Sequence, residues 1–112
     1  MNAFKELTSS NDWKNVMAQS MKEPILVFKH STTCPISASA YQEYISFETE
    51  LDKYVVKVIE SRPVSNEIAN DIGVTHQSPQ IFLIKEEKPL WNASHWHITE
   101  KSIEEAIKEN LS

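Results

Sequence analysis

The sequence predicts an α/β fold, in which a mixed sheet of four or five strands is flanked by about four helices. Short apolar or β-branched runs alternate along the chain with segments whose apolar residues recur every three or four positions. The runs Ile25–Phe28 and Ile81–Ile84 are continuously apolar, which is typical of strands covered on both faces. The length of 112 residues fits a single domain over 1–112.

The first half of the chain is expected to begin with a weak strand at Phe4–Leu7, followed by a short helix carrying Trp13. One of the polar residues at positions 10–12 is expected to cap that helix. After the strand Ile25–Phe28, a helix of about four turns begins at Pro35. Its apolar stripe comprises Ile36, Ala40, Tyr44, Phe47 and Leu51.

The second half continues the alternation and then ends in a hairpin and a helix. The expected elements are a strand at Val55–Ile59, a helix from Pro63 to Gly73, a strand at Ile81–Ile84, a polar turn at 85–88, a strand from Leu90 to about His97 and a helix capped by Thr99. The alternating part predicts parallel strands with helices on both faces, whereas the last two strands are antiparallel to each other.

Composition excludes several classes of protein. The chain has 11 basic and 16 acidic residues, a net charge of −5, and no basic stripe, so nucleic acid is not an expected partner. Its single glycine excludes the glycine-rich loops that bind nucleotides. No apolar run approaches the roughly 18 residues of a membrane span, and no signal peptide is evident, so we expect a cytoplasmic protein.

The only cysteine, Cys34, is the one residue whose position indicates chemistry. One thiol excludes an internal disulfide and a thiolate-rich zinc site. Because Pro35 suits the first position of a helix, Cys34 is expected at the N-cap or next to it, where free N–H groups and the helix dipole favour thiolate. The alternative is a small buried apolar residue. Small polar neighbours leave the sulfur approachable: Thr32, Thr33, Ser37 and Ser39.

The histidines give weaker indications. His30 precedes Cys34 by four residues and is expected to end its strand at the surface, with no orienting third group for hydrolase chemistry. His95 and His97 would share one face of a strand and could bind a metal, but a solvated strand face is the preferred interpretation. A phosphatase is excluded because the only arginine, Arg62, belongs to a different element from the cysteine.

Several of these segments together resemble the thioredoxin superfamily. They are the strand Ile25–Phe28, the Thr-Cys-Pro-Ile-Ser turn at 33–37 with the helix after it, and the segment Val74–Pro79 before an apolar strand. With Trp91 and the triplet His95–His97, the turn is similar to that of monothiol bacilliredoxins, proteins of the bacillithiol system. The resemblance extends over nearly the whole chain and implies a thioredoxin-like fold.

The resemblance also implies roles for individual residues. Cys34 would be the catalytic thiol, and Ser37 stands where a second cysteine is absent, with a hydroxyl that could donate to the Cys34 thiolate. Ser78–Pro79 would be a cis bond beside Cys34, with the Ser78 backbone able to bind a disulfide. Supporting roles fall to Thr33, Pro35, Ser37, Ser78 and Pro79, and contacts with the client or thiol to His76, Gln77 and Trp96.

Glutaredoxins share the Cys-Pro pair and the turn at Pro79, but they use a Gly-Gly turn to hold glutathione. Here the corresponding turn is Lys85–Lys88, which favours a different small thiol. The monothiol glutaredoxins that carry iron–sulfur clusters differ at Pro35 and Ile36.

The leading hypothesis is therefore a monothiol thiol–disulfide oxidoreductase that removes bacillithiol from S-bacillithiolated client proteins through a Cys34 mixed disulfide. Bacillithiol would be the co-substrate, its reductase system a partner, and no metal or nucleotide is expected. Two alternatives remain. In one, Cys34 from two chains and a small thiol hold a [2Fe–2S] cluster; in the other, the chain is a non-catalytic interaction module.

Overall fold

The computed structural model describes residues 4–111 as five strands, four α-helices and one 3₁₀ helix. The elements in chain order are β1 (Phe4–Glu6), α1 (Ser10–Ser20), β2 (Ile25–His30), α2 (Pro35–Ser46), β3 (Asp52–Lys57), α3 (Arg62–Ile72), β4 (Gln80–Lys85), β5 (Lys88–Ser94), η1 (His95–His97) and α4 (Glu100–Leu111). The predicted α/β class and the order of strands and helices are confirmed. Among the described residues, no helix is long and apolar enough to cross a membrane.

The five strands form one mixed sheet in the order β1-β3-β2-β4-β5. Strands β1 and β2 both pair in parallel with β3, as the alternating pattern predicts. Strand β4 runs antiparallel to β2, and the hairpin partner β5 runs antiparallel to β4. Strand β2 therefore lies at the centre of the sheet, and the residues after its C-terminal end are held by strands on both sides.

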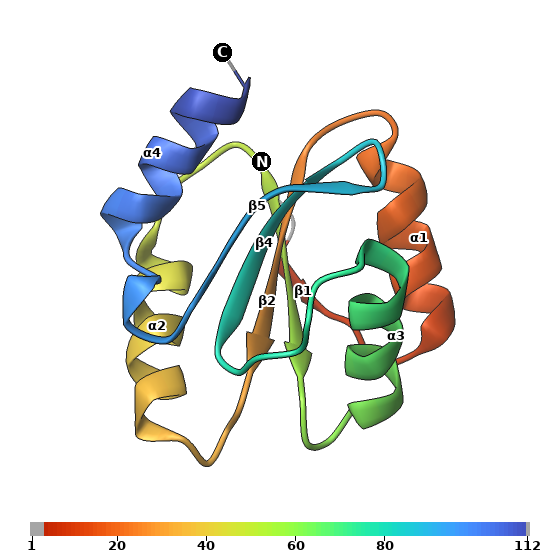
Figure 1. Cartoon of the computed structure of the whole chain (residues 1–112), viewed down its shortest axis with the longest axis horizontal. Coiled ribbons are helices and arrows are strands. Elements are labelled where there is room, and N and C mark those ends of the chain that lie inside the picture. Colours follow the sequence, from red (N-terminus) through yellow and green to blue (C-terminus); the bar gives the residue numbers. More distant parts are fainter. Residues whose placement is uncertain (1–3, 112) are drawn as a thin grey trace.

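Helices cover both faces of the sheet, with α1 and α3 on one side and α2 and α4 on the other (Figure 1). The central strand divides its side chains between the two layers by simple alternation. Ile25 and Val27 pack under α1 and α3, whereas Leu26 and Phe28 pack under α2 and α4. All six residues of β2 are buried, which explains its continuous apolar run and also places Lys29 and His30 inside the protein.

Two helix boundaries differ from the sequence prediction. Helix α1 is capped by Ser9, whose Oγ accepts the Asp12 N–H at 3.0 Å, rather than by a residue at 10–12. Helix α2 ends at Ser46 although its apolar stripe continues further. The Lys53 ammonium from β3 donates to the carbonyl groups of Tyr44 and Phe47. Carbonyl groups at the end of the helix thus have a cation as their hydrogen-bond partner.

The second half shows two more differences. Strand β3 covers Asp52–Lys57 instead of Val55–Ile59, and Ile59 lies exposed in the loop that follows. Strand β5 ends at Ser94, and His95–His97 form a 3₁₀ turn that begins with a positive φ of 54° at His95. The last helix begins as expected, because Thr99 Oγ1 accepts the Ser102 N–H at 3.0 Å.

Candidate functional site

Cys34 is the N-cap of α2, at the end of the sheet where the parallel strand β2 terminates. Pro35 occupies the first turn of the helix, and the Ala38 N–H donates to the Cys34 carbonyl at 3.0 Å. The cysteine is partly exposed, and Thr33 and Pro35 on either side are exposed. The residue is thus partly open to solvent at the N-terminal, positive end of the α2 dipole.

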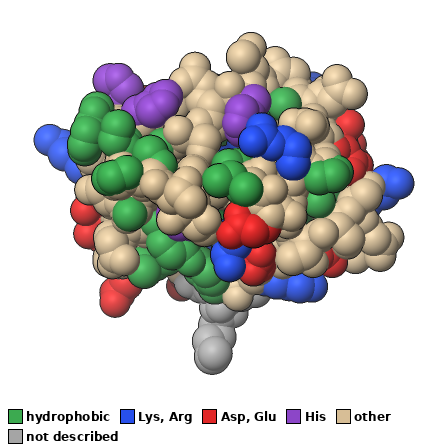
Figure 2. All heavy atoms as spheres, turned by 90° about the horizontal axis from the view of Figure 1, so that it is seen from below, with side chains coloured by type: hydrophobic (Ala, Val, Ile, Leu, Met, Phe, Trp, Pro, Cys, Tyr) green, Lys and Arg blue, Asp and Glu red, His purple; other side chains and the backbone are tan. Residues whose placement is uncertain are grey.

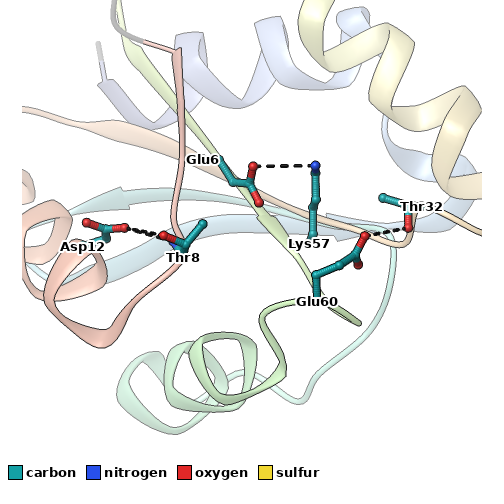
Figure 3. Close-up of polar contacts among 6 residues, drawn as sticks. All are labelled: Glu6, Thr8, Asp12, Thr32, Lys57 and Glu60. Carbon is teal, nitrogen blue, oxygen red and sulfur yellow. Dashed lines mark hydrogen bonds and ion pairs between the residues drawn. The ribbon is translucent and has the colours of Figure 1, made fainter.

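The loop that carries Cys34 is tied to its surroundings at its base. The Cys34 N–H donates to the Ser31 carbonyl at 3.2 Å, closing a tight turn. The Thr32 hydroxyl donates to Glu60 Oε2 at 3.2 Å, which joins this loop to the segment between β3 and α3 (Figure 3). Close by, Lys57 forms an ion pair with Glu6 at 3.6 Å (Figure 3).

Ser37 is fully buried one turn into α2, and its oxygen has two hydrogen bonds. It accepts the Ser31 N–H at 2.9 Å and lies 2.8 Å from His30 Nδ1. No hydrogen bond joins Ser37 to the Cys34 sulfur among residues 4–111. The structure therefore places Ser37 as a clasp for the loop at 31–34, and the expected bond from its hydroxyl to the thiolate is not formed.

His30 is the last residue of β2, but it is buried, with 9% of its surface exposed. This corrects the sequence prediction, which placed His30 at the surface. Its ring stacks on that of Tyr41 with centroids 4.4 Å apart. Burial lowers the pKa of His30, with a smaller opposing effect of Glu60 and a further lowering by Lys57. His30 is therefore neutral at neutral pH, and its Nδ1 can accept a hydrogen bond from the Ser37 hydroxyl.

The bond between Ser78 and Pro79 is cis, in agreement with the prediction. Pro79 is buried, and its carbonyl accepts the His95 N–H at 3.1 Å, which links the turn to η1. Ser78 Oγ is buried and is the single such side-chain atom without a hydrogen-bond partner within the described part of the chain. The turn enters β4, the strand beside β2, and so lies at the same end of the sheet as Cys34.

The three residues expected to contact a thiol or client differ in exposure and lie in two segments, one before Pro79 and one in η1. Gln77 is exposed in the segment before Pro79, and its N–H donates to the side chain of the buried Gln80. His76 is half-buried and turns its Nδ1 toward Lys29 Nζ at 3.1 Å. Trp96 is 69% exposed in η1.

A small groove lies between α2 and the segment that contains η1. Its volume is about 160 Å³, and it is lined by Ile36, Ser39, Ala40, Glu43, His95, Trp96, Ile98 and Thr99. Trp96 lines this groove from the 3₁₀ turn η1. Among residues 4–111, no three metal-ligating side chains converge.

Sequence reasoning missed Lys29. This lysine is fully buried near the end of β2, and its Nζ donates to the Ser65 carbonyl at 3.0 Å. Burial, with a smaller contribution from Arg62, lowers the pKa of Lys29 to about 8. The available indication was a lysine directly after a continuous apolar run and five residues before the cysteine.

The fold and the site together define a thioredoxin-fold protein with one thiol at a helix N-terminus and a cis proline at the same end of the sheet. The family model for the monothiol bacilliredoxin BrxC matches residues 5–103. This chain therefore belongs to the monothiol bacilliredoxin family, and its function is thiol redox chemistry.

Comparison with solved structures supports the same fold. A protein described as having a thioredoxin fold is 34% identical, covers 93% of both chains and superimposes with a TM-score of 0.85. Thioredoxin from Fasciola hepatica is 16% identical, with 95% of this chain and 98% of that chain covered and a TM-score of 0.75. Thioredoxin from Schistosoma mansoni is 14% identical, with 97% and 99% covered and a TM-score of 0.76.

Proposed function

We propose that this protein removes bacillithiol from S-bacillithiolated client proteins through a mixed disulfide on Cys34. The observation that carries the proposal is the lone, partly exposed cysteine at the N-cap of α2, in a chain of the monothiol bacilliredoxin family. We also propose a cytoplasmic location, where a lone thiol stays reduced between turnovers.

The first step is an exchange at sulfur. The Cys34 thiolate attacks the bacillithiol sulfur of the client's mixed disulfide, so that a Cys34–bacillithiol bond forms and the client–bacillithiol bond breaks. The client sulfur leaves as a thiolate and takes a proton from water. Cys34 is thereby oxidised to a mixed disulfide, and the client thiol is reduced.

The second step needs a thiol from outside the chain, because Cys34 has no second cysteine to resolve it. A bacillithiol thiolate attacks the bound bacillithiol sulfur, releases oxidised bacillithiol and returns Cys34 to the thiolate; a thiol of a partner redoxin would act in the same way. The reductase system then regenerates bacillithiol. Ser78 and Pro79 would border the bound disulfide, and Trp96 would contact the client or the thiol.

The test is the intact mass of the protein after mixing with oxidised bacillithiol, oxidised glutathione or a bacillithiolated client. We expect one bacillithiol adduct per chain and release of the client thiol. Cys34→Ser should abolish both, whereas Ser46→Ala, at the far end of α2, should react like the wild type.

The other outcomes distinguish the alternatives. Absence of an adduct with all three reagents would contradict the proposal. Brown protein from anaerobic purification, with visible absorption, would then favour the [2Fe–2S] carrier, and colourless protein would favour the interaction module.

A further inference from the structure

Three basic residues, Lys29, Arg62 and His76, come from segments at the end of the sheet that carries Cys34. Lys29 Nζ, fully buried, lies 3.1 Å from His76 Nδ1 and 3.0 Å from the Ser65 carbonyl of α3. Arg62 opens α3 three residues before Ser65, whose Oγ lies 3.4 Å from His76 Nδ1. After the larger effect of burial, the charge of Arg62 also lowers the pKa of both Lys29 and His76. These three side chains form one cluster, called here the basic cluster.

No carboxylate neutralises the basic cluster. Within residues 4–111, Lys29 and Arg62 take part in no ion pair, and the Arg62 guanidinium has no hydrogen bond. Glu60, on the segment before α3, accepts a hydrogen bond from Thr32. An ammonium buried without a counter-ion costs stability. Here the Lys29 ammonium is held by the Ser65 carbonyl at 3.0 Å and lies 5.9 Å from the centroid of the Phe82 ring.

The basic cluster and Cys34 share one face of the molecule. Cys34 follows β2, Arg62 follows β3, and His76 precedes β4, and these three strand ends are neighbours in the sheet. Figure 2 looks onto this face and shows that Lys or Arg and histidine atoms are exposed on it. The contact between Thr32 and Glu60 joins the cysteine loop to the segment before α3 (Figure 3).

We propose that Arg62 and His76, supported from beneath by Lys29, bind a carboxylate of the small thiol that passes through Cys34. The unpaired guanidinium has the forked donors that match a carboxylate. Because the Lys29 ammonium donates to His76 Nδ1, the proton of the neutral imidazole lies on Nε2 and forms a second donor. Lys29 is buried and touches no ligand, so it is a positioning residue that also supplies positive charge.

The N-terminus of α3 adds to the positive electrostatic potential at the basic cluster. Ser61 makes no side-chain capping hydrogen bond, so the positive end of the helix dipole beside Arg62 is not neutralised by a cap. This inference rests on the proposed function, because it assigns the charge of the thiol that Cys34 exchanges.

The test compares two small disulfides of opposite charge, dithiodipropionate with two carboxylates and cystamine with two ammonium groups. In either reaction the Cys34 thiolate forms a bond to one probe sulfur, the probe S–S bond breaks, and the other half leaves as a thiolate. The probe itself is the oxidant. The readout is the ratio of the two adduct rates, followed by intact mass at low salt.

Arg62→Gln is expected to lower the ratio of anionic to cationic rates about fivefold, the size of one exposed ion pair. The rate with cystamine should rise, because positive potential is removed. Arg62→Lys keeps the charge and should keep most of the ratio. Lys101→Gln removes the same charge from exposed α4 and should leave the ratio at the wild-type value.

Salt near 1 M, where the screening length is about 3 Å, should bring the wild-type ratio down to that of Arg62→Gln. Lys29→Met removes the buried donor and should lower the ratio as Arg62→Gln does, with an unchanged far-UV spectrum as the check on folding. Should Lys29→Met fail to fold, the comparison between Arg62→Gln and Lys101→Gln decides.

The failure of this inference is distinct from failure of the proposed function. Equal ratios in the wild type, Arg62→Gln and Lys101→Gln would overturn the carboxylate site while Cys34 still reacts. No adduct with either probe would instead count against the exchange chemistry itself.

Discussion

Ser37, at the position of an absent second cysteine, has a structural task in this chain. Its buried oxygen accepts the Ser31 N–H and contacts His30 Nδ1, so it closes the loop that presents Cys34. His30 is in turn held by stacking on Tyr41. Stacking and hydrogen bonding therefore connect Tyr41, His30 and Ser37 to the loop that carries Cys34.

Ser37→Ala should lower the free energy of unfolding by about 1–3 kcal/mol, because it leaves the Ser31 N–H and His30 Nδ1 without their partner. Thiol exchange should become slower but persist, since Cys34 remains the N-cap of α2. Urea denaturation and the alkylation rate of Cys34 measure the two effects. Ser39→Ala, exposed on the same helix, is the control, and equal stability of the two variants would contradict the clasp.

At the scale of elements, helix α3 ends where the sequence predicts because Gly73 adopts a left-handed conformation with φ of 69°. Its N–H donates to the Ala69 carbonyl at 3.0 Å, which closes the last turn. This stop sets the start of the segment that leads to His76 and Pro79. The C-terminus of α3 thus helps to position the basic cluster and the cis proline turn.

Gly73→Ala should cost about 1 kcal/mol of stability, and the cost should come from backbone conformation alone. A Cβ added at this position meets nothing within 4 Å, so no clash contributes. Gly73→Asn should cost less, because asparagine tolerates the left-handed region better than alanine does. Thermal unfolding of the three proteins measures the order, and an alanine variant as stable as the wild type would refute the argument.

The whole molecule should lose stability in mild acid. Burial is the largest cause that lowers the pKa of both His30 and His76. The charged neighbours of His30 are Glu60, which raises its pKa, and Lys57, which lowers it. Those of His76 are Lys29 and Arg62, which both lower its pKa. The unfolded chain, with histidine pKa values near 6.5, then binds more protons than the folded protein does. The free energy of unfolding is therefore fully present above about pH 6.5 and falls as the pH decreases below it.

Urea denaturation between pH 8 and 5.5 is the measurement. His76→Gln should reduce the dependence on pH, whereas His97→Gln, at an exposed position in η1, should keep it. A free energy of unfolding that stays constant over this range would contradict the assignment of neutral, buried histidines.

Much of the architecture followed from local pattern. The apolar run at 25–28, the helix after Pro35 and the stop at Gly73 are properties of a few neighbouring residues, and the structure confirms all three. The position of Cys34 at a helix N-cap came from Pro35 alone. The end of α2 differed from the prediction, and there Lys53 of the next strand, β3, binds the last carbonyl groups of the helix.

What the sequence determined by itself is the α/β class, the order of the elements and the one residue able to do thiol chemistry. Tertiary structure decided the surroundings of that residue: the burial of His30 and Lys29, the clasp at Ser37 and the contact of Lys29 with His76. Periodicity and capping act over one or two turns, whereas the contacts of Lys29 with Ser65 and His76 join segments far apart in the chain. Strand order and register bring such segments together, and they arise only when the whole sheet forms.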